Sequence, residues 1–157
     1  MIELSPMTQS EFQAYLKYAV AAYGESMVRG GNWQVGEAPE LAEQTLNDLL
    51  PDGLHTPGHH LLSIVDVTLK QAVGYLWVGI ADRDDGPYAY IYDFVILEPF
   101  RRRGYGKTTL RALEEAARGM GARMIAAHVY NENSVARALY DQIGYTVDQV
   151  ALTKVVD

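Results

Sequence analysis

Twenty residues from Tyr88 to Lys107 constrain the fold of this chain more than any other stretch. The first ten, Tyr88–Leu97, are apolar or aromatic almost throughout and predict a central strand that is buried on both faces. The letters EPFRRR then give a short loop, and Gly104-Tyr105-Gly106 opens a helix that we expect to run to Arg118 and stop at Gly119. A strand that leads through a glycine turn into a helix brings backbone N–H groups and the positive end of a helix dipole to one point, and this geometry binds anions.

The loop itself has the chemistry of a phosphate site. Glycines at positions 104 and 106 let a phosphate approach the backbone closely, and four basic residues surround them: Arg101, Arg102, Arg103 and Lys107. Two nucleotide-binding motifs are excluded, because a P-loop needs glycine where the chain has Arg101, and a dinucleotide fingerprint needs a third glycine where it has Thr109. What remains is R-x-x-G-x-G after a strand, which we interpret as a pyrophosphate site.

The rest of the chain predicts a mixed α/β fold without repeats or low-complexity linkers. Apolar patterning and turn residues predict strands at Ile2–Ser5, His60–Val67, Ala72–Ile80 and Met124–Val129, with one or two closing strands in Tyr145–Val156. Helical spacing predicts helices at Ser10–Ala22 with Ser10 as N-cap, at Pro39–Leu50, and from a cap at Asn133 or Ser134 to a stop at Gly144. The expected order of elements is βααβββαβαβ.

A second motif lies twenty-five residues after the glycine loop. Asn131 to Tyr145 reads NENSVARALYDQIGY, which contains N-x-x-A-x-x-L-Y-x-x-x-G-Y. With both motifs in this order, the chain resembles the GNAT superfamily of N-acetyltransferases, most specifically over Ala72 to Tyr145. The resemblance implies one domain over residues 1–157, with a curved mixed sheet whose central strands splay apart between flanking helices. It also implies acetyl-CoA as the cosubstrate and an amine as the acceptor.

The resemblance assigns roles to individual residues. The pantetheine arm of acetyl-CoA would pair with the backbone of Phe94, Val95 and Ile96. Its pyrophosphate would lie on the backbone of the glycine loop, at Arg101, Arg102, Arg103, Gly104, Tyr105, Gly106, Lys107 and Thr108. From the second motif, Asn133 would contact the cosubstrate and Tyr140 would be the general acid. On helical periodicity alone, Tyr140 is a core aromatic of an amphipathic helix.

A general base is needed as well, because a protonated alkylamine with a pKa of about 10.4 must lose a proton before it can attack. Asp93 is the best candidate. A carboxyl group inside an apolar strand is costly unless it is paired or neutral, so its presence needs a reason. The alternative is a buried acid bonded to structural N–H groups or to a tyrosine.

The acceptor pocket is the least determined part of the site. The candidate residues are Trp33 in a glycine-rich loop, Tyr90 and Tyr92 on the buried strand, and His128 at the end of the next strand, with Glu132 similarly placed. The resemblance makes the first two helices and the loop between them one wall of this pocket. Each candidate also fits an ordinary structural role, as a core residue, an edge residue or part of a solvated helix face.

Composition excludes several function classes. Without cysteine there is no disulfide, thiolate nucleophile or thiolate metal site, and the pair His59-His60 lacks further partners, so we expect no metal. No signal peptide opens the sequence, and no apolar run reaches the ~18 residues that a membrane span needs. We expect a cytoplasmic protein, a monomer or a homodimer, that does not bind membranes.

The charge is divided unevenly along the chain. A formal net charge of −7 disfavours binding to nucleic acid. The first 98 residues hold 4 basic and 14 acidic residues, whereas the remainder holds 9 basic and 6 acidic ones. The basic excess surrounds the predicted pyrophosphate site, and the acidic excess favours a cationic amine as acceptor. The alternative to an N-acetyltransferase is a non-catalytic acyl-CoA-binding sensor or interaction module with the same fold.

Overall fold

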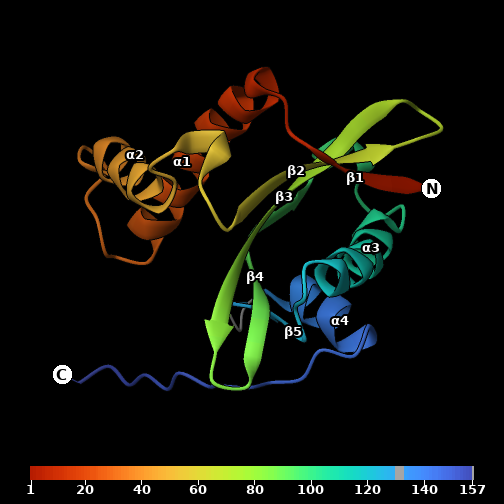
Figure 1. Cartoon of the computed structure of the whole chain (residues 1–157). Helices are drawn as coiled ribbons and strands as arrows, with labels where there is room; N and C mark the ends of the chain where they lie inside the picture. Colours follow the sequence, from red (N-terminus) through yellow and green to blue (C-terminus); the bar gives the residue numbers. More distant parts are fainter. Residues whose placement is uncertain (130–132, 157) are drawn as a thin grey trace. The chain divides into compact units, whose positions relative to one another are not determined.

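The computed structural model describes residues 1–129 and 133–156, which divide into two units, Met1–Ala127 and His128–Asp157. In the first unit the described strands form one sheet in the order β1-β2-β3-β4-β5 (Figure 1). These strands are Ile2–Pro6, His59–Asp66, Gln71–Arg83, Gly86–Ile96 and Met124–Ala127. The first four pair antiparallel and β4 pairs with β5 parallel, so the predicted mixed α/β sheet is confirmed.

Helices cover both faces of this sheet (Figure 1). Helices α1 (Gln9–Arg29) and α2 (Ala38–Leu49) lie on one face, and α3 (Tyr105–Gly119) lies on the other. Two short 3₁₀ turns, η1 (Gly53–His55) and η2 (Glu98–Phe100), complete the described elements of the first unit.

The core is divided between the two faces because alternate residues of a strand point to opposite sides. On the α1 side the largest buried side chains are Phe12, Tyr15, Leu46, Leu61 and Trp77. On the other side α3 packs against β1 and β4 and buries Leu110 and Leu113. Trp77 of β3 therefore faces α1, whereas its neighbours Leu76 and Val78 are buried on the opposite face.

Helix α1 differs from the predicted helix at both ends. Its N-cap is Thr8 rather than Ser10, because Thr8 and Glu11 form a reciprocal capping box: the Glu11 N–H donates to Thr8 Oγ1 (3.1 Å) and the Thr8 N–H donates to Glu11 Oε1 (3.0 Å). The helix runs on past the predicted end at Ala22 to Arg29. Gly24 lies inside the helix where α2 begins beside it, and a Cβ at this position would be in van der Waals contact with the Ala38 carbonyl oxygen at 3.4 Å.

Helix α3 begins where the sequence predicts and ends slightly later. Gly119 is its last residue rather than its stop, and Gly121 adopts the left-handed backbone conformation (φ +83°) that follows the helix. The predicted strand Met124–Val129 likewise ends at Ala127.

Strand β4 is less buried than its composition predicts. Only Ala89 and Ile91 are buried, and Tyr92 is 40% exposed, so the prediction of burial on both faces is wrong. The reason is incomplete pairing on one side. Strand β5 pairs only with Tyr88 to Ile91, and β4 continues to Ile96 beyond that contact.

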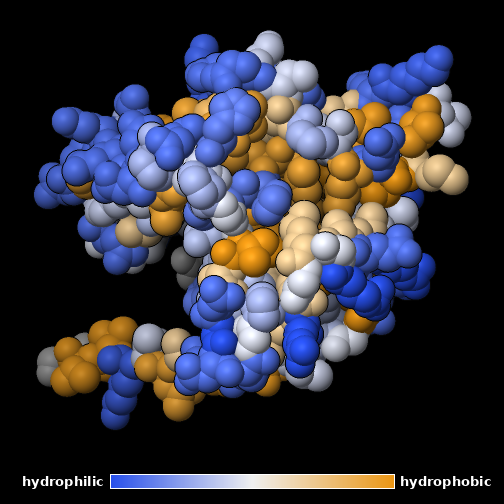
Figure 2. Space-filling model, in the orientation of Figure 1, coloured by the Kyte–Doolittle hydropathy of each residue, from blue (hydrophilic) through white to orange (hydrophobic). Residues whose placement is uncertain are grey.

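The second unit contains α4 (Ser134–Gln142), which Asn133 caps by accepting the Ala136 N–H at its side-chain oxygen (3.2 Å). The predicted closing strands are wrong for the described residues, because 145–156 form no strand. The apolar side chains there are largely exposed, with Leu152 at 89%, and Figure 2 shows hydrophobic side chains interspersed with hydrophilic ones along this segment. Strand-forming residues need a paired neighbour to make a ladder, and none of the described strands provides one. Among the residues that the structure describes, no helix combines the length and apolar composition needed to cross a membrane.

Candidate active site

Asp93 lies at an irregularity in β4. Between Trp77 and Val78 the register of β3 against β4 shifts, so that Asp93 faces Trp77, Ile91 faces Val78, and Tyr92 is the extra residue of a bulge. Asp93 is half-buried and points to the α1 side of the sheet. There the hydroxyl of Tyr15, a residue of α1 that is 1% exposed, donates a hydrogen bond of 2.7 Å to Asp93 Oδ2.

Burial dominates the electrostatics of this pair. Desolvation raises the pKa of Asp93 above its ordinary value, although the hydrogen bonds from Tyr15 and from the Phe94 backbone N–H partly oppose the shift. Burial and the neighbouring carboxylate raise the pKa of Tyr15 as well, so Tyr15 stays protonated as the donor. Asp93 therefore has the tyrosine and backbone N–H partners of the structural alternative, and its carboxyl group also has an elevated pKa.

The segment that follows Asp93 has an edge that β5 does not cover. Among the described strands, Phe94, Val95 and Ile96 pair with β3 alone, since the β4–β5 pairing ends at Ile91. β3 approaches very closely here: a Cβ at Gly74 would collide with the Val95 carbonyl oxygen. The backbone predicted to pair with pantetheine thus lies on a strand whose other edge packs closely against Gly74 of β3.

The glycine loop turns sharply into α3. Arg102 (φ +61°) and Gly104 (φ +84°) both adopt the left-handed conformation, and Gly104 is the residue that precedes the helix. A Cβ at Gly104 would meet no atom within 4 Å, so the space beside the helix N-terminus is open. Thr108 closes the first turn, because its hydroxyl donates to the Gly104 carbonyl at 3.0 Å. Open space next to backbone N–H groups at a helix start fits an anion.

Side chains of this loop hold it to the sheet. Arg101 Nε donates to the Ile96 carbonyl oxygen at 2.8 Å, and the Arg103 guanidinium lies 5.8 Å from the centre of the Phe100 ring. The Tyr105 hydroxyl donates to Asp66 Oδ2 at 2.6 Å, which lowers the pKa of Asp66. These contacts position the loop, while Arg101 to Gly104 remain exposed.

The predicted residues of the second motif lie in the second unit and are described within it. The rings of Tyr140 and Tyr145 meet edge to face with their centres 4.9 Å apart, and the Tyr145 N–H donates to the Tyr140 carbonyl at 3.0 Å. Asn133 caps α4, and His128 follows the end of β5 as an exposed residue. Glu132 lies outside the described residues.

Comparison with known proteins identifies the family. The family model for the acetyltransferase (GNAT) family matches residues 27–145, which is more than half of the chain. The chain belongs to the GNAT acetyltransferase family. YycN of Bacillus subtilis strain 168, an uncharacterized N-acetyltransferase, is 42% identical over 153 residues, which are 98% of this chain and 97% of YycN. The crystal structure of YycN superposes with a TM-score of 0.90 over 99% of both chains. A second uncharacterized N-acetyltransferase of the same organism, YdgE, is 30% identical over 96% of each chain.

The predicted acceptor residues that lie in the first unit fall into two places. Trp33 packs edge to face on Tyr23 of α1, with ring centres 5.4 Å apart. Tyr90 and Tyr92 belong to a group of rings on the α1 face of the sheet, 4.9 Å apart and at right angles within about 20°. The structure brings Tyr92 together with Trp77, at 4.7 Å and nearly parallel.

Sequence reasoning missed three residues of the candidate site. Tyr15 bonds to Asp93, and His59 and Trp77 surround Tyr92. A signal for Tyr15 was present, because Phe12, Tyr15 and Ala19 follow helical spacing and mark the buried face of α1. His59 carried no such signal, since its contacts depend on strand register.

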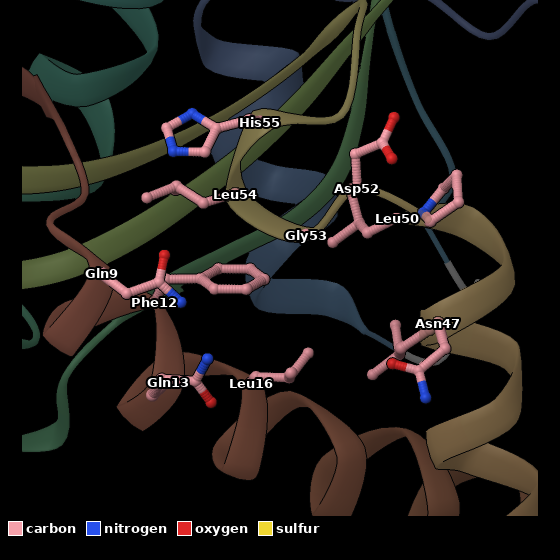
Figure 3. A pocket seen from close by; sticks show the side chains of 12 residues that line it. Gln9, Phe12, Gln13, Leu16, Asn47, Leu50, Asp52, Gly53, Leu54 and His55 are labelled. Atoms are coloured by element: carbon pink, nitrogen blue, oxygen red, sulfur yellow. The ribbon is translucent and has the colours of Figure 1, made fainter.

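A separate hollow of about 280 Å³ lies where the start of α1 meets the end of α2 and η1 (Figure 3). Phe12, Leu16 and Leu54 form its apolar part, and none of the predicted site residues lines it. It is therefore not the active-site candidate. Within residues 1–129 and 133–156, no three His, Cys, Asp or Glu side chains are grouped to hold a metal ion.

Proposed function

We propose that this GNAT protein transfers an acetyl group from acetyl-CoA directly to a primary amine of a small molecule, peptide or protein. The observation that carries the proposal is Asp93, a half-buried carboxyl group with a raised pKa at the point where β4 loses its second strand partner. Because the family model spans residues 27–145 and so crosses both units, we also propose that they form one N-acetyltransferase domain.

Acetyl-CoA fits the residues present at the predicted cosubstrate site. The open space beside Gly104, the exposed Arg102 and the N-terminus of α3 suit a pyrophosphate, and the uncovered edge Phe94–Ile96 suits a pantetheine amide. When bound, acetyl-CoA supplies a thioester carbonyl that an amine can attack. Asn133 is proposed as a further contact from the second motif.

Two side chains manage the protons. The Asp93 carboxylate is proposed as the base, directly or through a water molecule, because its raised pKa brings it nearer to the pKa of the amine proton that it must accept. The Tyr15 O–H holds this carboxylate in place through Oδ2. Tyr140 is proposed as the acid, because it occupies the tyrosine position of the second motif and a phenol O–H can give its proton to a departing thiolate.

The test is an assay of CoA release from acetyl-CoA with a panel of polyamines, aminoglycosides, amino acids and lysine peptides. Asp93→Asn should lower kcat by about 10²–10⁴-fold, the usual contribution of a general base, with the Kd for acetyl-CoA nearly unchanged. Tyr140→Phe should lower kcat with the same Kd. The matched control is Glu3→Gln, which changes an exposed carboxylate of β1 and should leave kcat as in the wild type.

A different outcome would point to the second candidate function. If acetyl-CoA binds tightly and no amine in the panel releases CoA, the non-catalytic acyl-CoA-binding module replaces the enzyme. If Asp93→Asn retains full kcat on a good acceptor, the enzyme stands and Asp93 is not its base.

A further inference from the structure

A second hollow, of about 330 Å³, lies on the α1 face of the sheet near the β3–β4 hairpin. Its walls are the rings of His59, Tyr88, Tyr90 and Tyr92, and its floor is β3 at Gly79. We call it the aromatic pocket. Among the described residues, no side chain of Asp, Glu, Lys or Arg lines it. Its chemistry is thus that of electron-rich ring faces.

The pocket exists because the middle of a cross-strand row lacks a side chain. His59, Gly79 and Tyr90 lie opposite one another on β2, β3 and β4. The ring of Tyr92, the bulge residue, extends over Gly79 and takes up part of the space. A Cβ at position 79 would approach Tyr92 Cε2 to 2.6 Å, so any larger residue there would displace this ring.

The rings are held in place before any ligand arrives. Trp77 stacks on Tyr92 with ring centres 4.7 Å apart and planes 16° apart, and its Nε1–H donates to His59 Nδ1 at 3.0 Å. His59 in turn lies 5.2 Å from Tyr92. Because Nδ1 accepts a hydrogen bond, His59 is a neutral imidazole, and burial together with His60 lowers its pKa. The His59 side chain therefore adds no positive charge to the pocket.

Two independent observations favour a cation as its occupant. The guanidinium of Arg83 lies 5.3 Å from the centre of the Tyr88 ring, which shows that a ring of the pocket wall accepts a cation at its face. Three exposed carboxylates of the β3–β4 hairpin next to the pocket, Asp82, Asp84 and Asp85, outnumber the two cations beside them, Arg83 and Arg123. Their negative potential attracts cations to this end of the sheet.

The aromatic pocket lies near Asp93 on the same face of the sheet. Asp93 faces Trp77, and the row of His59, Gly79 and Tyr90 is the next one along the same face. Rows on one face of a sheet are two residues apart, or roughly 7 Å along the strand. A group in the aromatic pocket would thus lie a short alkyl chain away from an amine at Asp93.

Resting on the proposed function, we propose that the aromatic pocket binds an alkylated ammonium group carried by the amine acceptor. The acceptor class is then an amine with a second, cationic nitrogen a few bonds away. Choline and its neutral isostere 3,3-dimethylbutan-1-ol are the probes, because they differ only in nitrogen against carbon at the centre of the same three methyl groups. Neither reacts at Asp93, so binding is measured without acetyl-CoA and apart from turnover.

The experiment is a titration of the protein with each probe, followed at the Trp77 indole N–H resonance by NMR. We expect choline to bind about 5- to 30-fold more tightly than its isostere, which corresponds to the ~1–2 kcal/mol of a partly desolvated cation–π contact. Tyr92→Leu should abolish this preference, and Gly79→Ala should weaken it by displacing the ring. Tyr92→Phe is the matched control, since it keeps the ring face and should keep the preference.

Equal affinities for choline and its isostere would overturn the inference. A choline preference that persists in the Tyr92→Leu variant, while the Tyr92→Phe variant binds both probes like the wild type, would overturn it as well. Its failure is distinct from failure of the proposed function. Amine-dependent CoA release without a choline preference would refute the ammonium-binding pocket and support the acetyltransferase activity. A choline preference in a protein that releases no CoA would support the ammonium-binding pocket and refute the acetyltransferase activity.

Discussion

The hydrogen bond between Tyr15 and Asp93 allows a quantitative test of whether the carboxyl group is ionised in the folded protein. Tyr15→Phe removes only the donor, because the ring and its 5.5 Å contact with Tyr75 remain. A hydrogen bond to a charged acceptor contributes about 1.5–3 kcal/mol, and one to a neutral acceptor contributes about 0.5–1.5 kcal/mol. The variant Asp93→Asn keeps a neutral acceptor of the same shape. In this background, Tyr15→Phe should therefore lower the free energy of unfolding by about 1–1.5 kcal/mol less than it does in the wild type.

The measurement is a double-mutant cycle of urea unfolding at pH 8, with Cm and m determined for the wild type, both single variants and the double variant. The void left by the missing hydroxyl is the same in both backgrounds and cancels in the cycle. A coupling energy within about 0.3 kcal/mol of zero would refute an ionised, hydrogen-bonded Asp93.

The pH dependence of the free energy of unfolding of the same variants tests the raised pKa of Asp93. Because the pKa of Asp93 is raised in the folded state, its contribution to stability is fully present below the ordinary value of 3.8 and is lost as the pH rises through the raised pKa. Asp93→Asn has no such loss. Relative to the wild type, its free energy of unfolding should rise with pH, and a flat difference would contradict the raised pKa.

Three further substitutions test the supports of the site. Gly104→Ala places an L-residue at φ +84°, at a cost of about 1–2 kcal/mol, and calorimetry should show weaker acetyl-CoA binding; an unchanged Kd would remove the loop from the binding site. Gly74→Ala should lower the free energy of unfolding by about 1–3 kcal/mol because its Cβ meets a carbonyl of β4, whereas Gly119→Ala, which has open space, should not; equal effects in urea would contradict the close approach. Glu11→Gln should cost about 0.3–1 kcal/mol at pH 7, and the difference should vanish as the pH falls below 4.5, because Thr8 and Ser63 lower the pKa of Glu11; a loss that persists in acid would contradict this.

The part of the site built from neighbouring residues could be predicted from the sequence. The order strand, glycine turn and helix is local, and β4, Gly104 and α3 follow one another as the pattern indicates. The position of Asp93 on the strand was readable for the same reason. Its partner was not, because Tyr15 lies 78 residues away in the chain and meets Asp93 only once α1 packs on the sheet.

Register-dependent features also escaped prediction. The bulge that places Tyr92 beside Trp77 arises from a shift of one residue between two strands, and no spacing within β4 encodes it. The C-terminal segment shows the converse. Its apolar residues predict strands, and this prediction is wrong for the described residues, because strand propensity makes a ladder only where a partner edge is present.

One carboxylate holds together two segments that are far apart in the sequence. Asp66 accepts the Leu69 N–H at Oδ1 (2.9 Å), inside the β2–β3 turn, and the Tyr105 hydroxyl at Oδ2, at the first residue of α3. The start of α3 therefore cannot open locally without losing a charge-assisted bond that also organises the turn. Amide hydrogen exchange in the turn should consequently report on the glycine loop, and a ligand that orders the loop should slow exchange at Leu69 without touching it.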